Sequence, residues 1–310
     1  MYYFIVNMKS GSGSASYCWS EIRSVLARRK VEYKAFRTKR KGHATVLAKK
    51  ISRLEGRVIN LIVVGGDGTI NEVINGIEDF KKVRVGIIPT GSGNDCVRGL
   101  NISGSPGDIL ESILDNDDYM NIDLGRVKSN SMRKPRYYVI SSGVGMDAIV
   151  CKKTIGSKQK RFLNRFGMGK LVYLLITIET LLSMRTVRGT ISFDGEKSKE
   201  FDRLIFAAAM NLKAEGGGVP MAPTALPDDG RLSMCLAHDI SRIMCFVKLP
   251  VLVCGRHDML KGFVLRDFGS CVIHLERPVT LHADGEYLGE ATDIYFEIQK
   301  NRLKLLNEIV

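Results

Sequence analysis

Two hydrophobic periods alternate along roughly the first 125 residues of the chain. Apolar runs of strand length occupy residues 2–7, 31–36, 58–66 and 83–89. Apolar residues that return every three or four positions, as in helices, occupy residues 18–29, 44–54, 69–77 and 108–115. Repeated strand–helix units predict a parallel sheet covered by helices on both faces. We therefore expect residues 1–125 to form an α/β domain.

After a basic turn at residues 129–136, the pattern changes to short β-rich runs separated by turn residues, at 137–145, 186–193, 203–211, 230–237, 271–276 and 279–288. Two of these runs have the form of hairpins that close on Asp-Gly, and a helical stretch at residues 162–184 interrupts the series. We interpret residues 126–295 as a mostly antiparallel second domain. The tail, residues 296–310, can return to the first domain.

Length and composition agree with two globular domains: the chain has 310 residues, of which 45% are hydrophobic. The net charge of +13 favours nucleotides, nucleic acid or an anionic membrane surface as partners, although a basic soluble surface has the same charge. Seven scattered cysteines indicate reduced thiols in a cytoplasmic protein. The N-terminus lacks the charged start of a signal peptide, and the apolar stretch 171–184 is short and contains Glu179, which favours a core helix.

The sequence VVGGDGTINEVINGI, residues 63–77, joins a predicted strand to a predicted helix. Gly65, Gly66 and Gly68 allow backbone N–H groups to approach a ligand, and the positive end of the following helix suits an anion. Thr69 and Glu72 have the spacing of a capping box, which predicts that the helix begins there. Asp67 is an unexpected neighbour for a phosphate unless a metal ion or a ribose hydroxyl is also bound. A tight glycine-rich turn is the structural alternative.

Two further loops have the same character. Residues 86–100, GIIPTGSGNDCVRGL, place Gly91, Ser92 and Gly93 after a strand and Asn94-Asp95 at the start of a helix, and Asn7–Gly13 follows the first strand. The first-strand loop lacks the Gly-Lys-Ser/Thr ending of a Walker A loop. Three such loops at the carboxyl ends of strands in one sheet predict a phosphate-binding site.

The ordered set of motifs resembles the diacylglycerol kinase catalytic domain, specifically the bacterial lipid kinases of that type, over nearly the whole chain. The segments that carry the resemblance are NMKSGSG, RTKRKGHATVLAKK, GGDGTINEV, PTGSGNDCVRGL, SSGVGMDAIV, NLKAEGGGVPMAPTALPDDGRLSM and HADGEYL. Met8 stands where the family has proline, and Ser92 stands where it usually has threonine. The resemblance implies an ATP-binding α/β domain related in fold to NAD kinases and phosphofructokinases, followed by a β-sandwich-like lipid domain, with the site between them.

The resemblance also implies which residues bind the cofactors. Residues for ATP are Asn7, Met8, Lys9, Ser10, Gly11, Thr38, Gly65, Gly66, Asp67, Gly68, Thr69, Asn71, Glu72, Gly91, Ser92, Asn94 and Asp95. A structural Mg²⁺ is expected at Asp229 and at the backbone carbonyls of Leu226 and Arg231, which tolerate sequence change.

Phosphoryl transfer to an alcohol also requires a base for the hydroxyl proton. The family assigns this role to the glutamate of its last Asp-Gly-Glu, here Glu286, with Asp284 helping to place metal or substrate. The chain contains Asp-Gly-Glu twice, and the earlier copy, at Asp194 to Glu196, is followed by a polar stretch that favours a solvated turn. The continuation after Glu286 departs from the family's proline-containing pattern, which leaves the fine geometry of the acceptor pocket open.

Two segments concentrate positive charge, residues 28–41 and 152–170. The second mixes cations with Phe162, Leu163, Phe166 and Met168, which suits reversible docking on anionic headgroups, whereas a solvated helix face is the alternative for both. No nucleic-acid-binding motif accompanies the charge. We expect a cytoplasmic, reversibly membrane-associated, ATP- and Mg²⁺-dependent lipid kinase that acts on diacylglycerol and can form a homodimer. Kinases of sphingoid bases or monoacylglycerol, an NAD kinase and an inactive nucleotide-binding regulator are the alternatives.

Overall fold

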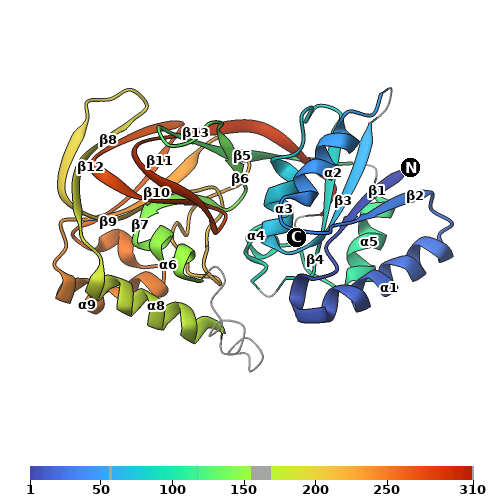
Figure 1. The fold of residues 1–310 in the computed structure, drawn as a ribbon, viewed down its shortest axis with the longest axis horizontal. Coiled ribbons are helices and arrows are strands. Elements are labelled where there is room, and N and C mark those ends of the chain that lie inside the picture. Colours follow the sequence, from blue (N-terminus) through green and yellow to red (C-terminus); the bar gives the residue numbers. More distant parts are fainter. Residues whose placement is uncertain (56–57, 92, 117, 155–168, 309–310) are drawn as a thin grey trace. The chain divides into compact units, whose positions relative to one another are not determined.

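The computed structural model describes residues 1–55, 58–91, 93–116, 118–154 and 169–308. Its internal contacts divide the chain into two compact units (Figure 1). Unit 1 contains Met1–Leu124 together with Lys300–Val310, and unit 2 contains Gly125–Gln299. The first unit therefore includes segments from both ends of the chain.

Unit 1 is built on a parallel sheet in the strand order β2-β1-β3-β4, extended at β4 by the end of β13. Its elements are β1 (Tyr2–Val6), η1 (Ser10–Gly13), α1 (Ser14–Arg28), β2 (Tyr33–Arg37), α2 (His43–Ser52), β3 (Ile59–Gly65), α3 (Asp67–Ile74), β4 (Val83–Pro89), α4 (Asp95–Gly99) and α5 (Pro106–Asp115). Helices α1 and α5 pack together, as do α2 and α3 (Figure 1). This is the predicted strand–helix alternation.

The central strands of unit 1 are buried on both faces because helices cover the sheet on both sides. All residues of β3 except Asn60 are buried, and α1 contributes a buried stripe at Trp19, Ile22 and Leu26. The ring of Trp19 meets that of Phe4 edge-on at a centroid distance of 5.7 Å. The apolar periods of the sequence therefore correspond to the core of this unit.

The last strand completes unit 1 at the outer edge of β4. Lys304 and Leu305 pair in parallel with Arg84 and Val85. The Asn307 side chain then replaces a further strand residue: its Oδ1 accepts from the Ile87 N–H at 2.7 Å and its Nδ2 donates to the Ile87 carbonyl at 2.8 Å. These contacts satisfy backbone groups that an edge strand would otherwise leave open.

Unit 2 is mostly antiparallel. Its elements are β6 (Arg136–Tyr138), β7 (Ser141–Gly145), α6 (Met146–Thr154), α8 (Gly169–Ser183), β8 (Val187–Phe193), β9 (Lys199–Met210), β10 (Leu232–His238), α9 (Arg242–Val253), η2 (His257–Met259), β11 (Phe263–Phe268), β12 (Ser270–Ala283) and β13 (Glu286–Leu305), with β5 (Met120–Ser129) entering it from unit 1. The strand order is β11-β10-β9-β7-β12-β13. Strand β8 pairs with both β12 and β9, so strands β9, β7, β12 and β8 close on themselves around a buried apolar core.

Several local features differ from the sequence-based expectation. Helices α6 and α9 and strand β11 were not predicted. The predicted helix at residues 162–184 is described only from Gly169 to Ser183, and residues 162–168 lie outside the described residues. Apolar residues lie on several sides of α9, as its sequence RIMCFVKLPVLV shows, so no one-sided period marks it as a helix.

Candidate active site

The predicted phosphate loops of unit 1 lie at the carboxyl ends of adjacent strands. Asn7, Met8, Lys9, Ser10 and Gly11 follow β1, and Thr38 follows β2. Gly65 ends β3, Gly66 is the N-cap of α3, and Asp67, Gly68, Thr69, Asn71 and Glu72 lie in α3. Gly91 and Asn94 follow β4, and Asp95 begins α4. The parallel register aligns Val6 with Val64 and Gly65 with Pro89, so the loops begin at one level of the sheet. Ser92 lies outside the described residues.

The glycines allow these loops to touch. A Cβ on Gly66 would lie 3.1 Å from the Gly91 Cα and 3.3 Å from the Ser10 Oγ. Gly11 has a φ of +63°, and a Cβ there would come within 2.0 Å of the Thr90 carbonyl oxygen. A side chain at Gly11 would collide with the Thr90 carbonyl, and one at Gly66 would crowd Gly91 and Ser10, so the two glycines allow the loops to approach this closely.

Side chains from each loop fix the next one. The Asn7 Nδ2 donates to the Thr69 Oγ1 at 2.9 Å, and the Asn7 Oδ1 accepts from the Lys9 N–H at 3.1 Å. This asparagine therefore joins the loop after β1 to the first turn of α3. Lys9, in the same loop, has an exposed side chain.

Asp67 holds the loop that follows β4. Its carboxylate accepts the N–H of Asp95 at 3.2 Å and of Cys96 at 3.1 Å, which caps the start of α4. Burial raises the pKa of Asp67, and the hydrogen bonds to Cys96 and Asp95 and the charge of Arg98 partly oppose that rise. A carboxylate has about four lone-pair sites, so this one retains acceptor capacity for a cation.

Glu72 acts differently from the prediction. The capping-box spacing predicted a helix start at Thr69, but α3 begins at Asp67, and the N-cap Gly66 makes no side-chain capping bond. The Glu72 carboxylate instead accepts the N–H groups of Gly42 at 2.7 Å and Ala44 at 3.1 Å at the start of α2. The capping-box prediction was therefore wrong, and Glu72 links two helices instead.

The fit of this region to a nucleotide rests on its donors and its unsatisfied atoms. The Thr90 Oγ1 and the Asn94 Oδ1 are buried without a hydrogen-bond partner in the described part of the chain. Buried polar atoms normally have partners, and both atoms belong to the loop that follows β4. A hydroxyl-rich, phosphate-bearing ligand or its waters would satisfy them.

In unit 2, Asp284 and Gly285 form a two-residue turn between β12 and β13. Their φ angles are +46° and +76°, and Ala283 pairs with Glu286 across the turn. The buried Asp284 carboxylate accepts the N–H groups of Val139 at 2.9 Å, Ile140 at 2.8 Å and Ser141 at 3.2 Å. Asp284 therefore anchors the turn, and Glu286 begins β13 half-buried.

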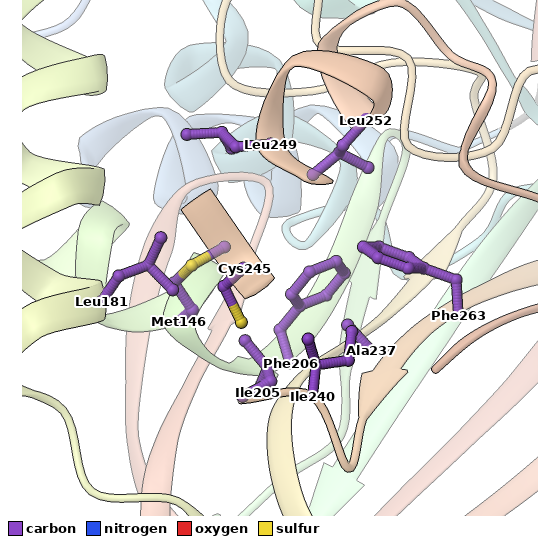
Figure 2. Close-up of a pocket in the computed structure, with 10 residues that line it drawn as sticks. All are labelled: Met146, Leu181, Ile205, Phe206, Ala237, Ile240, Cys245, Leu249, Leu252 and Phe263. Carbon is purple, nitrogen blue, oxygen red and sulfur yellow. The ribbon is translucent and has the colours of Figure 1, made fainter. Parts of the chain in front are cut away.

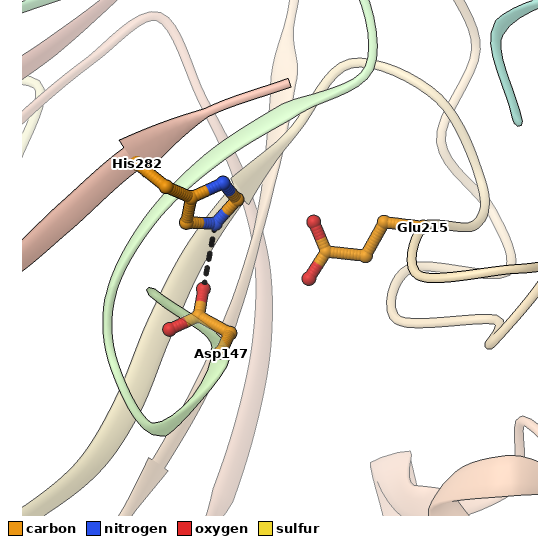
Figure 3. A group of neighbouring side chains, drawn as sticks. All are labelled: Asp147, Glu215 and His282. Atoms are coloured by element: carbon orange, nitrogen blue, oxygen red, sulfur yellow. Dashed lines mark hydrogen bonds and ion pairs between the residues drawn. The ribbon is translucent and has the colours of Figure 1, made fainter. Parts of the chain in front are cut away.

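A second group of ionisable residues was not predicted. Asp147 at the start of α6, Glu215 and His282 place carboxylate and imidazole atoms within 4.8 Å of one another (Figure 3). The His282 Nε2 lies 3.1 Å from the Asp147 Oδ2, and Ser141 donates to Glu215. Burial alone would lower the pKa of His282, but the hydrogen bond to Asp147 and the surrounding carboxylates raise it. The group can bind a cation or hydrogen-bond a polar headgroup.

These three residues lie inside motifs that the sequence made visible, SSGVGMDAIV, NLKAEGGG and HADGEYL. Each motif contains one ionisable residue to which the sequence analysis gave no role, and these residues were the signal that could have predicted the group. Their proximity depends on the pairing of β7 with both β9 and β12, which no local period reveals.

The expected Mg²⁺ turn has the chemistry of a cation site. Asp229 is exposed, and its Oδ1 accepts the Arg231 N–H at 2.9 Å. Gly230 between them has a φ of +74°. The exposed Asp229 carboxylate offers an oxygen ligand, and the carbonyls of Leu226 and Arg231 would add oxygens of the kind that Mg²⁺ prefers.

A small apolar cavity of about 20 Å³ lies inside unit 2 (Figure 2). It is lined by Met146, Leu181, Ile205, Phe206, Ala237, Ile240, Cys245, Leu249, Leu252 and Phe263. These residues come from helices α6, α8 and α9, from β9 to β11, and from the segment between β10 and α9. A space of this size holds about one water molecule, so a larger apolar ligand requires these helices to move.

The two basic segments are partly balanced by acids. Arg28 and Arg29 pair with Glu111, and Arg29 also pairs with Asp115. Lys152 lies 3.1 Å from Glu290, and Lys153 lies 2.8 Å from Glu179. Residues 155–168 of the second segment, including all four of its named apolar side chains, lie outside the described residues.

No helix in the described ranges is both long and apolar enough to span a membrane.

Comparison with known proteins decides the family. A model of the diacylglycerol kinase catalytic domain matches residues 1–127, and a model of the YegS C-terminal NAD kinase beta sandwich-like domain matches residues 140–307. The chain belongs to the diacylglycerol kinase family of lipid kinases. This lipid kinase has the predicted fold class, an α/β domain followed by a β-sandwich-like domain, and the predicted enzyme class is confirmed.

Individual relatives agree over most of their lengths. The Bacillus subtilis protein named "Putative lipid kinase YtlR" is 28% identical over 292 residues, which cover 93% of this chain and 94% of the relative. The diacylglycerol kinase of Staphylococcus carnosus is 26% identical over 300 residues, covering 96% and 92%. A crystal structure of a "putative diacylglycerol kinase" from Bacillus anthracis has the same fold, with a TM-score of 0.77 at 20% identity and coverage of 99% and 96%.

Proposed function

We propose that this lipid kinase transfers the γ-phosphate of ATP, with Mg²⁺, to the hydroxyl of diacylglycerol and so forms phosphatidic acid. The observation that carries the proposal is the convergence of three glycine loops at the carboxyl ends of β1, β3 and β4. Ligands of open α/β sheets bind at such ends. The names of the relatives support diacylglycerol as the acceptor.

In this proposal unit 1 is the nucleotide domain. Backbone N–H groups of the glycine loops and the Lys9 ammonium bind the phosphates, while Asn7 and Asp67 hold the loops in position through the contacts described above. Mg²⁺, when bound, neutralises charge on the phosphate oxygens. Asp67 has acceptor capacity left for that ion.

Unit 2 is the lipid domain and supplies the base. Glu286 accepts the proton of the acceptor hydroxyl as the oxygen forms its bond to phosphorus, and ADP leaves with the pair of electrons from the broken bond. Asp284 is a positioning residue, because its carboxylate is committed to three backbone N–H groups. The apolar cavity beneath α8 and α9 is the site for acyl chains, entered when these helices separate.

An assay with radiolabelled ATP tests the acceptor. The purified chain is incubated with diacylglycerol, a sphingoid base, monoacylglycerol or NAD, each with and without Mg²⁺, and labelled products are separated. We expect label in phosphatidic acid, lost with EDTA and restored by Mg²⁺. Label only in another lipid would show that this lipid, and not diacylglycerol, is the acceptor. Label in no product would contradict catalysis by this chain.

The Mg²⁺ turn has a test that does not depend on activity. Adding Mg²⁺ raises the thermal midpoint of the unmodified chain, because an ion that binds only the folded state stabilises it. Asp229→Asn removes one ligand charge and reduces that rise. Asp228→Asn, one residue earlier, is the matched control. An equal rise in all three proteins would show that Mg²⁺ does not bind at this turn.

A further inference from the structure

Helix α9 has an apolar face that no described part of the protein covers. The exposed fractions of Ile243 and Val247 are 78% and 62%, and Pro250 and Cys254 continue the same line at the spacing i, i+4, i+7, i+11. Met244 and Val253 beside this line are 43% and 50% exposed. Single exposed apolar residues are ordinary, but a row of them along one helix marks an interaction site.

The opposite face of the same helix is committed to the interior. Cys245, Leu249 and Leu252, also at i, i+4, i+7, line the apolar cavity, and Cys245 and Leu252 are buried (Figure 2). The exposed row is therefore not an alternative packing surface for the core. A helix that is apolar on opposite sides separates one apolar environment, the cavity, from another.

The charges around α9 point to what that second environment is. No aspartate or glutamate occurs from Ile240 to His257, and the acids nearest in sequence, Asp239 and Asp258, lie just outside the two ends of the helix. Arg242, Lys248, Arg256 and Lys261 lie along or just beyond the helix, and none of them forms an ion pair with a described residue. This differs from Arg28, Arg29, Lys152 and Lys153, which all have acidic partners.

Two of these cations are held by the protein backbone. Arg242 donates to the carbonyls of Leu182 at 3.1 Å and Met184 at 3.0 Å, which joins the start of α9 to the end of α8, and Lys248 donates to the carbonyl of Lys261. Carbonyl partners leave the positive charges uncompensated. The Leu182 side chain is itself 59% exposed, so α8 extends the apolar surface where the two helices meet.

We propose that the face of α9 formed by Ile243, Val247 and Pro250, continued by Cys254 at the C-cap and flanked by these four cations, docks the kinase on an anionic bilayer. Apolar side chains enter the headgroup boundary while the cations meet lipid phosphates. The docked helix is the one that covers the apolar cavity, so a lipid reaches the cavity by displacing α9 without crossing water. The entry route rests on the proposed lipid substrate, whereas the docking surface rests on exposure and charge.

Paired substitutions test the docking face. Ile243→Glu with Val247→Glu places two negative charges on it without altering buried residues. Tyr17→Glu with Val46→Glu is the matched control, since these residues of α1 and α2 are 76% and 58% exposed. Binding is measured by co-sedimentation with phosphatidylcholine vesicles that contain or lack phosphatidylglycerol, and folding by thermal midpoint.

We expect the α9 pair to reduce vesicle binding at least about tenfold and the control pair to leave it within about twofold, with unchanged midpoints. Binding of the unmodified chain falls when phosphatidylglycerol is omitted or salt is raised. Equal losses in both pairs, or full binding by the α9 pair, would overturn the docking surface. If the unmodified chain is a dimer that only the α9 substitutions dissociate, while vesicle binding stays intact, the face contacts a second copy of the chain. That result would also overturn the docking surface.

A reporter on the helix gives a second readout. Ile243→Trp adds one indole to a chain whose single tryptophan, Trp19, is buried in unit 1. We expect its emission to shift to the blue on vesicles and to be quenched by brominated acyl chains. An unshifted, unquenched spectrum on bound protein would contradict the docking surface.

Activity separates this inference from the proposed function. The α9 pair should phosphorylate monomeric short-chain diacylglycerol at the unmodified rate and lose turnover only on vesicle-embedded diacylglycerol. An equal loss on both substrates would contradict docking through α9. An unmodified chain that phosphorylates neither would overturn the proposed acceptor, and vesicle binding would still decide the docking surface.

Discussion

Unit 2 contains the tripeptide Asp-Gly-Glu in two hairpin turns with nearly the same backbone. Asp194 and Gly195 have φ angles of +50° and +77°, and Asp284 and Gly285 have +46° and +76°. In both turns the aspartate carboxylate accepts backbone N–H groups from a distant segment. The aspartate therefore serves the fold in each copy and does not tell the two apart.

The glutamates and their surroundings differ. Glu196 is exposed and pairs with Arg266, whose hydrogen bond lowers the pKa of Glu196. Glu286 is half-buried, and the strand that precedes its turn carries the buried His282 that contacts Asp147. A carboxylate held ionised by arginine is a weak proton acceptor. The local environment, and not the motif, separates a turn flank from a candidate base.

The largest effect is expected at the candidate base. Glu286→Gln keeps the size of the side chain but removes its basicity, so turnover should fall about 10²- to 10⁴-fold while nucleotide-analogue binding stays within about twofold. The matched control, Glu196→Gln, should retain the unmodified rate. Steady-state kinetics and calorimetric binding measure both. More than a tenth of the activity in Glu286→Gln would remove the distinction between the two turns.

A smaller effect separates the two aspartates. Asp284 uses Oδ1 for Ile140 and Ser141 and Oδ2 for Val139, so Asp284→Asn turns an amide donor toward one N–H and should cost about 2 kcal/mol of unfolding free energy. Asp194 uses only Oδ1 for Gly269 and Ser270, and Asp194→Asn can keep both bonds, for a cost within about 0.5 kcal/mol.

Urea unfolding followed by far-ultraviolet circular dichroism measures this difference. Equal costs at the two aspartates would show that burial and the number of N–H partners do not separate the turns. Asp194→Ala, which removes both acceptors, should fall between the two Asn variants.

The smallest effect is a pH dependence at Glu196. Because Arg266 lowers the pKa of Glu196 in the folded state, the pair's contribution is fully present above the ordinary glutamate pKa and is lost as the pH falls through the lowered value. Glu196→Gln should therefore lower the thermal midpoint slightly at pH 7, by about 1 °C or less, and this difference should vanish once the pH is below the lowered pKa of Glu196. Carboxyl titration by nuclear magnetic resonance checks the direction of the pKa shift. An upward shift would exclude the ion pair as its cause.

Local patterns predicted the elements of unit 1 well, because its central strands β3 and β4 are mostly buried and helix α1 has a buried stripe. The three loops follow from the same patterns, since parallel strands bring their carboxyl ends to one edge. The roles of individual side chains did not follow. Glu72 has the sequence spacing of a cap for its own helix but caps another one, and only the packing of α2 on α3 decides between them.

Unit 2 was less predictable because its important contacts join distant segments. Asp147, Glu215 and His282 belong to three separate motifs, and their meeting depends on strand pairing. Helix α9 escaped prediction because a bilayer-facing row and a cavity-facing row on opposite sides leave no polar face to reveal the helical period. Under the proposed docking, α9 has apolar residues on both sides, and this is why its sequence shows no one-sided hydrophobic period.

The Asn307 contacts to Ile87 have a consequence for synthesis. The two residues are 220 positions apart, and the edge of β4 has no strand beside it until β13 has been made. At about 5 to 20 residues per second, the ribosome leaves that edge uncovered for roughly 10 to 45 s. The nucleotide domain of the nascent chain therefore presents an open parallel edge throughout production of unit 2, and a chaperone that shields strand edges would act during this interval.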